Sequence, residues 1–340
     1  MIELYDKNGY INFQTPANSG CPFNWLIGGR GIGKTYGGLK FLSVDNNFPF
    51  IYMRRTQRQI ELSCLPSTMP FKKINEDFGR KIKPKTEKDF ITFHENGIKI
   101  AFGASLSTFY NLRGVSLEEY GDLLFDEIIP EPMERTRKGE GRALLDALET
   151  INRNRELQGK RPVKCYFLGN SDMLNSDILR AFGIISIIEK MVADKKEFYI
   201  NHQSGNAVFY YSGSPISEKK RETALYKASK NKAFKDKAIE NEFADLRDSI
   251  DIKRIPLNEC RIFCNIDNEI GVYEHKTGAF FYACRVCNKG GRTFHMLNAN
   301  ERRTFAWTYA DIIRDAMASG AIFYDSFESK SALENFVFNY

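Results

Sequence analysis

Short apolar runs alternate with helix-favouring stretches through the first half of the chain. Each run has the length of a β-strand and falls far short of the roughly 20 residues that cross a bilayer. Such alternation predicts an α/β fold with a mostly parallel sheet flanked by helices. The runs are residues 25–27, 50–53, 98–102, 123–125 and 163–168.

The pattern changes twice further along the chain. Residues 212–248 lose the strand signals and become rich in lysine. Strand signals then return as a meander, which covers residues 261–266, 270–275 and 278–285 and precedes two helical patterns at 309–317 and 331–338. These changes predict three parts, namely an α/β domain over residues 1–205, a basic helical connector over 206–255 and a small α+β domain over 256–340.

Composition narrows the class of protein only a little. The chain has 340 residues, of which 42% are hydrophobic and 13% aromatic, so it can bury a sizeable core. Its formal charge of +6 permits contact with nucleic acid without requiring it. The first residues lack a basic stretch followed by an apolar one, the mark of a secretory signal. We therefore expect a soluble intracellular protein that does not enter a membrane.

One short sequence carries a specific chemical prediction. Residues 28–35 match the phosphate-binding pattern G-x-x-x-x-G-K-[ST] in full, after an apolar run and before a helical stretch. Glycines allow backbone N–H groups to point at phosphates, the lysine reaches the β- and γ-phosphates, and the last hydroxyl binds Mg²⁺. The predicted nucleotide-binding residues are Gly28, Gly29, Arg30, Gly31, Ile32, Gly33, Lys34 and Thr35.

Two carboxylates end the apolar run at 123–125. Asp126 is predicted to hold Mg²⁺ through water, and Glu127 to orient or deprotonate the water that attacks the γ-phosphate. This pair favours ATP hydrolysis over a small-molecule kinase or a switch GTPase, and no guanine-reading Asn/Thr-Lys-x-Asp motif follows. The sequence therefore predicts an ATPase that uses ATP and Mg²⁺.

Three further polar residues are candidates for catalysis. Asn170 ends the next apolar run and is either a sensor of the γ-phosphate or a cap of the following helix. Arg153 and Arg155 follow a predicted helix at 144–150. Either one of them reaches the γ-phosphate of the nucleotide bound to a neighbouring subunit, which requires a ring, or both are ordinary surface arginines.

Lysines gather in the connector, and cysteines in the meander. The lysine-rich stretch is either a solvated helix face or a surface for DNA phosphates, a neighbouring subunit or an RNA. Four cysteines at 260, 264, 284 and 287 could bind zinc, but alternation along strands favours buried free thiols. The basic residues of the connector are Lys219, Lys220, Arg221, Lys227, Lys230, Lys232, Lys235 and Lys237.

Taken in order and spacing, these motifs resemble one family, the DNA-packaging motor ATPases of small protein-primed podophages (the phi-29 type). The motifs that carry the resemblance are Phe50-Ile51-Tyr52-Met53-Arg54-Arg55, the 28–35 sequence, Leu124-Phe125-Asp126-Glu127, Arg153-Asn154-Arg155 and Leu168-Gly169-Asn170. The likeness is strongest in the first 175 residues, extends through 217–243 and is weak in the last 80. More distantly, residues 105–117 and the Asp-Glu pair resemble the ATPase of large terminases.

The resemblance implies a fold, partners and a place of action. The fold would be the additional-strand, catalytic-glutamate class of P-loop ATPase, followed by an RNase H-like C-terminal domain that has lost its nuclease site. The protein would form a homopentameric ring and pump double-stranded DNA through its centre. It would act in the cytoplasm of the infected bacterial host, transiently at the portal vertex of a procapsid, and a structural RNA is a further candidate partner.

The resemblance also implies roles for single residues. Arg30 matches an additional basic residue of the phosphate loop, Arg153 the trans-acting arginine finger and Asn170 the sensor. Arg54 or Arg55 matches a position that assists nucleotide binding or exchange. The residues that match DNA-facing positions of the pore are Arg113, Arg135, Arg137 and Lys138.

The last domain allows a competing interpretation, a terminase-like enzyme that both pumps and cuts DNA. Such a nuclease needs a compact cluster of carboxylates around two metal ions. Asp267 reads as a turn residue before Asn268, and Asp311, Asp315 and Asp325 are widely spaced. We therefore expect no cleavage. The motifs are also compatible with a monomeric kinase or with a DNA-binding scaffold whose ATPase is dead, and the intact Lys34 and Glu127 argue against the scaffold.

Overall fold

The computed structural model of the chain describes residues 2–87, 90–112, 114–131, 139–171, 173–220, 222–228, 243 and 250–339. The chain divides into two compact units, Met1–Ala244 and Asp245–Tyr340. Each unit has its own sheet and its own buried cluster of hydrophobic side chains. Both units combine helices with a sheet, in agreement with the predicted α/β first domain and α+β last domain.

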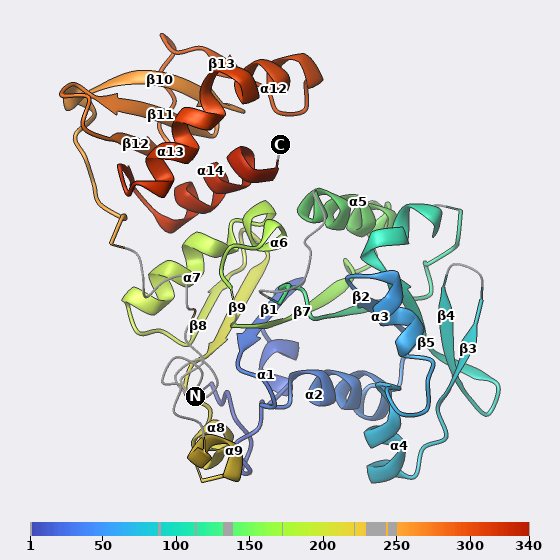
Figure 1. The fold of residues 1–340 in the computed structure, drawn as a ribbon. Coiled ribbons are helices and arrows are strands. Elements are labelled where there is room, and N and C mark those ends of the chain that lie inside the picture. The colour runs from blue at the N-terminus through green and yellow to red at the C-terminus, as the bar shows by residue number, and fades with distance from the viewer. Residues whose placement is uncertain are drawn as a thin grey trace. The chain divides into compact units, whose positions relative to one another are not determined.

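In its described residues, the first unit is built on a nine-stranded sheet. The strands are β1 (Phe23–Gly28), β2 (Phe50–Arg54), β3 (Lys83–Thr86), β4 (Ile91–Glu95), β5 (Ile98–Ser105), β6 (Asp122–Asp126), β7 (Lys164–Asn170), β8 (Phe198–Asn201) and β9 (Asn206–Tyr211). Their order is β3-β4-β5-β2-β6-β7-β1-β9-β8 (Figure 1). The strands from β5 to β9 in this order all run parallel, and antiparallel strands complete both edges.

All five predicted apolar runs overlap strands of this parallel region, so the prediction of a mostly parallel sheet is confirmed. Strands of this kind are buried on both faces and read as continuous apolar runs. The boundary predicted at residue 205 is wrong, because it cuts the hairpin between β8 and β9. β9 is wholly buried and pairs with β1, so the sheet continues to Tyr211.

Helices cover both faces of the sheet. Figure 1 shows α2 and α4 on one side and α5, α6 and α7 on the other. The helices of this unit are α1 (Gln14–Ala17), α2 (Lys34–Lys40), η1 (Phe41–Asp45), α3 (Gln57–Leu62), α4 (Lys72–Phe78), η2 (Leu106–Leu112), α5 (Glu140–Asn152), η3 (Glu156–Gln158), α6 (Asp177–Ala181), α7 (Ile184–Ala193), α8 (Pro215–Lys220) and α9 (Ala224–Ala228).

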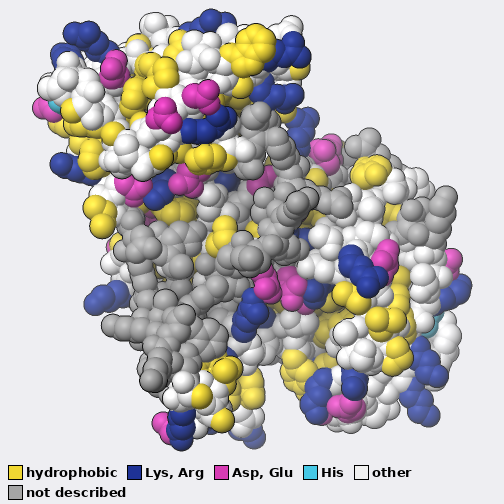
Figure 2. Space-filling model, viewed as in Figure 1, with side chains coloured by type: hydrophobic (Ala, Val, Ile, Leu, Met, Phe, Trp, Pro, Cys, Tyr) yellow, Lys and Arg dark blue, Asp and Glu magenta, His cyan; other side chains and the backbone are white. Residues whose placement is uncertain are grey.

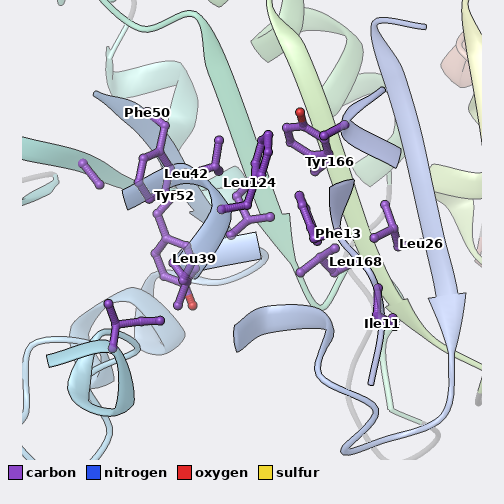
Figure 3. Packing of buried hydrophobic residues seen from close by; sticks show 14 of the residues in the cluster. Ile11, Phe13, Leu26, Leu39, Leu42, Phe50, Tyr52, Leu124, Tyr166 and Leu168 are labelled. Atoms are coloured by element: carbon purple, nitrogen blue, oxygen red, sulfur yellow. The ribbon is translucent and has the colours of Figure 1, made fainter. Parts of the chain in front are cut away.

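The helix that begins at Lys34 is fixed by apolar contacts with the sheet. Leu39 and Leu42 belong to the same buried cluster as Leu124 of β6, as Figure 3 shows. Phe13, from the N-terminal segment, lies against Tyr166 of β7 with ring centroids 5.0 Å apart. Burying a side chain of this size stabilises the fold by about 1.5–3 kcal/mol. The start of α2 is therefore held in place relative to the ends of the central strands.

A buried ion pair fixes the start of α5. Arg55 follows β2, its side chain is fully buried, and its Nη2 donates to Oε1 of Glu140 over 2.9 Å. A second hydrogen bond joins its Nε to Oε2 of the same carboxylate. Removing one partner of such a pair costs about 3–5 kcal/mol because the other charge stays buried. The pair thus couples the end of β2 to the helix that leads to Arg153 and Arg155.

The second unit contains, in the part of the chain that the structure describes, a five-stranded sheet in the order β13-β10-β11-β12-β14. β10, β11 and β12 form the predicted antiparallel meander, and β13 and β14 add to its two edges in parallel. The elements are η4 (Leu257–Glu259), β10 (Cys260–Ile266), β11 (Ile270–His275), β12 (Phe281–Cys284), β13 (Thr293–Phe294), α12 (Ala299–Phe305), η5 (Ala306–Ala310), α13 (Asp311–Ala318), β14 (Ile322–Tyr324) and α14 (Phe327–Asn339).

The cysteines of the meander are free thiols. Cys264 is fully buried, and burial raises its pKa to about 12. Burial also raises the pKa of Cys284, to about 11. A zinc ligand must be a thiolate, so these environments disfavour metal binding. Among the described residues, no three His, Cys, Asp or Glu side chains are grouped as a metal site would require.

Part of the predicted basic connector lies outside the described residues, including Arg221, Lys230, Lys232, Lys235 and Lys237. The described part of the predicted connector, residues 206–255, begins with β9 and continues into the short helices α8 and α9, so it is not wholly helical. On the face seen in Figure 2, Lys and Arg side chains are interspersed with Asp and Glu ones.

The helices of the described ranges were compared with the length and hydropathy of a membrane span, and none of them meets both requirements.

Candidate active site

The loop between β1 and α2, residues 28–35, is named here the glycine loop. Three of its glycines are required by geometry. Gly31 and Gly33 have φ of 73° and 92°, in the left-handed region that other residues rarely adopt. A Cβ at Gly28 would lie 2.8 Å from Tyr211 Cβ and from Ile32 Cδ1. The loop is therefore a tight turn packed against β9, the context that a phosphate-binding loop needs.

Lys34 begins α2 and is buried. Its Nζ donates to the carbonyl oxygens of Gly28 and Gly29, each at 2.7 Å. The ammonium is thus curled over the glycine loop. A cation held in this position is suited to bind phosphate oxygens that enter the loop.

Thr35 and Asp126 meet directly. Thr35 Oγ1 donates to Asp126 Oδ1 over 2.9 Å, and Asp126 is buried at the end of β6. Mg²⁺ prefers one or two oxygen ligands from the protein, completed by water and substrate phosphate. A hydroxyl and a carboxylate side by side next to a glycine loop fit that preference.

Glu127 has an unusual backbone conformation. Its φ is 60°, which is strained for a residue other than glycine and is found preferentially at functional sites. Its side chain is 44% exposed, while that of Asp126 is only 5% exposed. The two adjacent carboxylates therefore have different environments: Asp126 is enclosed, and Glu127 reaches the solvent of the cleft.

Arg54, at the end of β2, holds both carboxylates. Its Nη1 donates to Asp126 Oδ2 over 3.0 Å, and its Nη2 donates to Glu127 Oε2. Burial opposes its charge, but the neighbouring groups Tyr52, Asp126 and Glu127 raise the pKa of Arg54 above its usual value. Arg54 thus stays charged and fixes the direction of Glu127. Its predicted part in nucleotide binding remains a prediction.

Asn170 ends β7 and lies beside the glycine loop, because β7 and β1 pair in parallel with Asn170 opposite Gly28. The competing interpretation, a cap of the following helix, is wrong. That helix, α6, begins at Asp177, and its N-cap position is Ser176. The role of Asn170 as a sensor remains a prediction.

These groups share one cleft of about 970 Å³. This volume lies at the upper end of the range for small-molecule sites. One wall is the N-terminal segment, residues 6–14, which could not be singled out from the sequence because it carries no motif. It reaches the loop through long-range contacts: Ile11 N donates to Ile32 O over 3.0 Å. Site residues that line the cleft are Arg30, Gly31, Gly33, Lys34, Thr35, Asp126, Glu127 and Asn170.

Arg30 lines the cleft, and its side chain is exposed to solvent. Its guanidinium pairs with Glu131 at 2.7 Å, and both side chains are more than half exposed. Exposed pairs of this kind contribute about 0–1 kcal/mol, so the pair exchanges readily for another anion.

Arg153 and Arg155 lie at the other end of the strands. Nη1 of Arg153 is 3.4 Å from Oε1 of Glu118, and Nη1 of Arg155 donates to the carbonyl of Glu118 over 2.9 Å. Glu118 precedes β6, whereas Asp126 ends it. At about 3.3 Å per residue the two ends of β6 are roughly 13 Å apart. Neither arginine therefore lines the chain's own cleft.

The four residues predicted to contact DNA, Arg113, Arg135, Arg137 and Lys138, lie outside the described residues.

In the second unit, Asp267 has the turn conformation expected for it, with φ of 49°, and accepts a hydrogen bond from Met296 N. Asp311 pairs with Arg314, and Asp325 accepts from Arg285 N. Each of these carboxylates thus has a local partner.

The structure is thus a mixed α/β fold in which the glycine loop, Lys34 and the paired carboxylates meet at the carboxyl ends of the parallel strands. The chain belongs to the family of podovirus DNA encapsidation proteins (Gp16), whose family model matches residues 5–256. This membership confirms the resemblance seen in the motifs.

Two solved structures share the fold. The Phi-28 gp11 DNA packaging motor is 18% identical, with 94% of each chain covered and a TM-score of 0.65. The bacteriophage Phi-29 viral genome packaging motor assembly is 16% identical, with 97% of this chain and 98% of that chain covered and a TM-score of 0.64. A large terminase from the thermophilic bacteriophage D6E matches with a TM-score of 0.37, too low to support a conclusion. Among curated proteins, none has a significantly similar sequence.

Proposed function

We propose that this chain is an ATP-hydrolysing motor that moves double-stranded viral DNA into a procapsid. One observation carries the proposal: Lys34, Thr35, Asp126 and Glu127 converge in a single cleft beside the glycine loop. Family membership supports the DNA-packaging role. The position of β7 between β1 and β6 supports the additional-strand, catalytic-glutamate class of P-loop ATPase.

The glycine loop binds the phosphates of ATP through backbone N–H groups. Lys34 exchanges its two carbonyl partners for β- and γ-phosphate oxygens. Thr35 and Asp126 would hold Mg²⁺, Asp126 through water, and the ion would supply positive charge against the phosphate oxygens. Arg30 exchanges Glu131 for the nucleotide. Each group is already within the cleft, so binding requires side-chain rearrangement rather than a new fold.

Glu127 orients and activates the attacking water. Arg54 acts as a positioning residue, because its guanidinium donates to the carboxylate of Glu127, whose backbone lies in the left-handed region. Asn170, at the end of the neighbouring strand, lies beside the γ-phosphate and responds to its loss. The arrangement gives each of the two carboxylates a separate task.

The motor is a ring in which Arg153 of one subunit completes the site of the next. Arg153 lies away from its own cleft, pairs with the exposed carboxylate of Glu118 and donates to a single carbonyl, that of Val115. Arg155 instead donates to the carbonyls of Glu118, Tyr120 and Arg161, so it joins the segment before β6 to the segment before β7. Between the two candidates, this difference favours Arg153 as the finger and Arg155 as a structural residue.

The remaining parts of the proposal concern partners. Arg113, Arg135, Arg137 and Lys138 contact DNA phosphates without regard to sequence. The ring is a homopentamer on the procapsid portal in the host cytoplasm, with a structural RNA as a candidate partner. The second unit is an RNase H-like domain without nuclease activity, and the lysine-rich connector joins it to the ATPase domain.

Translocation along DNA tests this proposal. We expect the purified chain with ATP to displace a third-strand oligonucleotide from double-stranded DNA, at a rate that falls as salt is raised. The Lys34→Ala variant is expected to lose displacement, and circular dichroism at the assay temperature checks that it is still folded. Displacement by the variant, or by wild type with ADP in place of ATP, would contradict the proposal.

A further inference from the structure

Lys220, the last residue of α8, lies against the glycine loop. Its Nζ donates to the carbonyl oxygen of Arg30. A Cβ added at Gly31 would lie 3.4 Å from that Nζ and 3.6 Å from Cε. The two partners are 190 positions apart in the sequence, so only the fold brings the ammonium to the loop.

The position of Lys220 follows from the strand next to β1. Tyr211 ends β9 opposite Gly28, so the chain leaves the sheet beside the glycine loop and reaches α8 within a few residues. Ser214 is buried, and its Oγ donates to Gly9 O over 3.0 Å. Gly9 belongs to the N-terminal segment that borders the cleft, and Figure 1 places α8 near this end of the chain. The helix is therefore anchored to the wall of the site.

The charge of Lys220 is incompletely compensated. Burial lowers its pKa from the usual value. Among the described residues, a backbone carbonyl is its hydrogen-bond partner and no carboxylate pairs with it, whereas Lys227 of α9 pairs with Glu222 at 3.0 Å. A half-buried ammonium gains more from an anionic partner than from a neutral one. Here the anion to be expected beside it is a phosphate.

We infer that Lys220 binds the terminal phosphate of the triphosphate held by the glycine loop. This inference rests on the proposed ATP site. The residues that Lys220 touches, Arg30 and Gly31, belong to the glycine loop and line the cleft. Its flexible stem allows Nζ to exchange Arg30 O for a phosphate oxygen. The contact makes α8, the first helix of the connector, a sensor of whether the γ-phosphate is present.

The affinities of the chain for ATPγS and for ADP test whether Lys220 contacts the terminal phosphate. The Lys220→Met variant keeps the aliphatic stem and removes the charge. We expect it to weaken binding of ATPγS by about tenfold or more, since a hydrogen bond to a charged group is lost, and binding of ADP by less than about threefold. Lys219→Met is the matched control: Lys219 is the exposed neighbour on the same helix, and its loss is expected to change neither affinity.

A second readout avoids substitution. Acylation of lysines in the wild-type chain, followed by mass spectrometry, is expected to show that ATPγS protects Lys220 several-fold more than ADP does, with Lys219 unchanged. Equal ATPγS affinity in the Lys220→Met and Lys219→Met variants, or no protection of Lys220, would overturn the inference. If Lys34→Ala abolishes nucleotide binding while Lys220→Met has no effect, the inference fails and the ATP site stands. If wild type binds no nucleotide, both fail.

Discussion

Replacing Glu127 with glutamine is expected to lower the rate of ATP hydrolysis by about 10²–10⁴-fold, the usual contribution of a positioned general base. An amide has nearly the same shape but accepts no proton from the attacking water. ATP binding is expected to persist, because Lys34 and the glycine loop are untouched. Single-turnover hydrolysis and binding of a fluorescent ATP analogue separate the two effects.

A matched control is Glu61→Gln on α3. Glu61 is an exposed carboxylate that pairs with Arg58 at 3.6 Å, so its substitution makes the same chemical change away from the carboxylate pair. Its hydrolysis rate is expected to equal that of wild type. Hydrolysis by Glu127→Gln within threefold of this control would remove Glu127 from the mechanism, and another group would have to activate water.

Replacing Arg153 with alanine is expected to lower hydrolysis by about 10³–10⁵-fold in the assembled ring, the effect of losing an arginine finger. Its free energy of unfolding is expected to fall by about 1 kcal/mol, because the carboxylate partner is exposed and only one carbonyl, that of Val115, loses a donor. Replacing Arg155 with alanine is expected to affect stability rather than catalysis. Its melting temperature falls because three carbonyls lose a donor, and the protein that stays folded hydrolyses ATP.

Mixing two inactive variants tests whether the arginine acts between subunits. An equal mixture of Glu127→Gln and Arg153→Ala forms some interfaces with an intact glutamate on one side and an intact arginine on the other. We expect hydrolysis to return in the mixture, measured as phosphate release against each variant alone. A mixture as inactive as its components, with rings present by sedimentation, would count against a trans role for Arg153.

The glycine loop and the carboxylate pair could be predicted from sequence because each is a contiguous motif whose chemistry depends on neighbouring residues. The strand before the loop and the parallel sheet followed from apolar runs that are buried on both faces. Even β9 carried a strand signal in its apolar residues, Ala207 to Tyr211, which the boundary at 205 left out of the sheet.

The contacts that complete the site could not be predicted in this way. Arg54 reaches Glu127 because β2 and β6 pair with Met53 opposite Phe125, and this register depends on the whole sheet. The ammonium of Lys220 and the N-terminal segment reach the glycine loop through packing between distant parts of the chain. Whether Asn170 caps the following helix likewise depended on the residue at which α6 begins, and its role as a sensor stays a prediction.

The most direct test of the central claim, that the glycine-loop cleft hydrolyses ATP in the service of DNA movement, is steady-state phosphate release by the purified chain with and without double-stranded DNA. We expect DNA of any sequence to stimulate hydrolysis by the wild type several-fold, and the Lys34→Ala variant to release no phosphate in either condition. Hydrolysis that is indifferent to DNA, or that survives in Lys34→Ala, would contradict the claim.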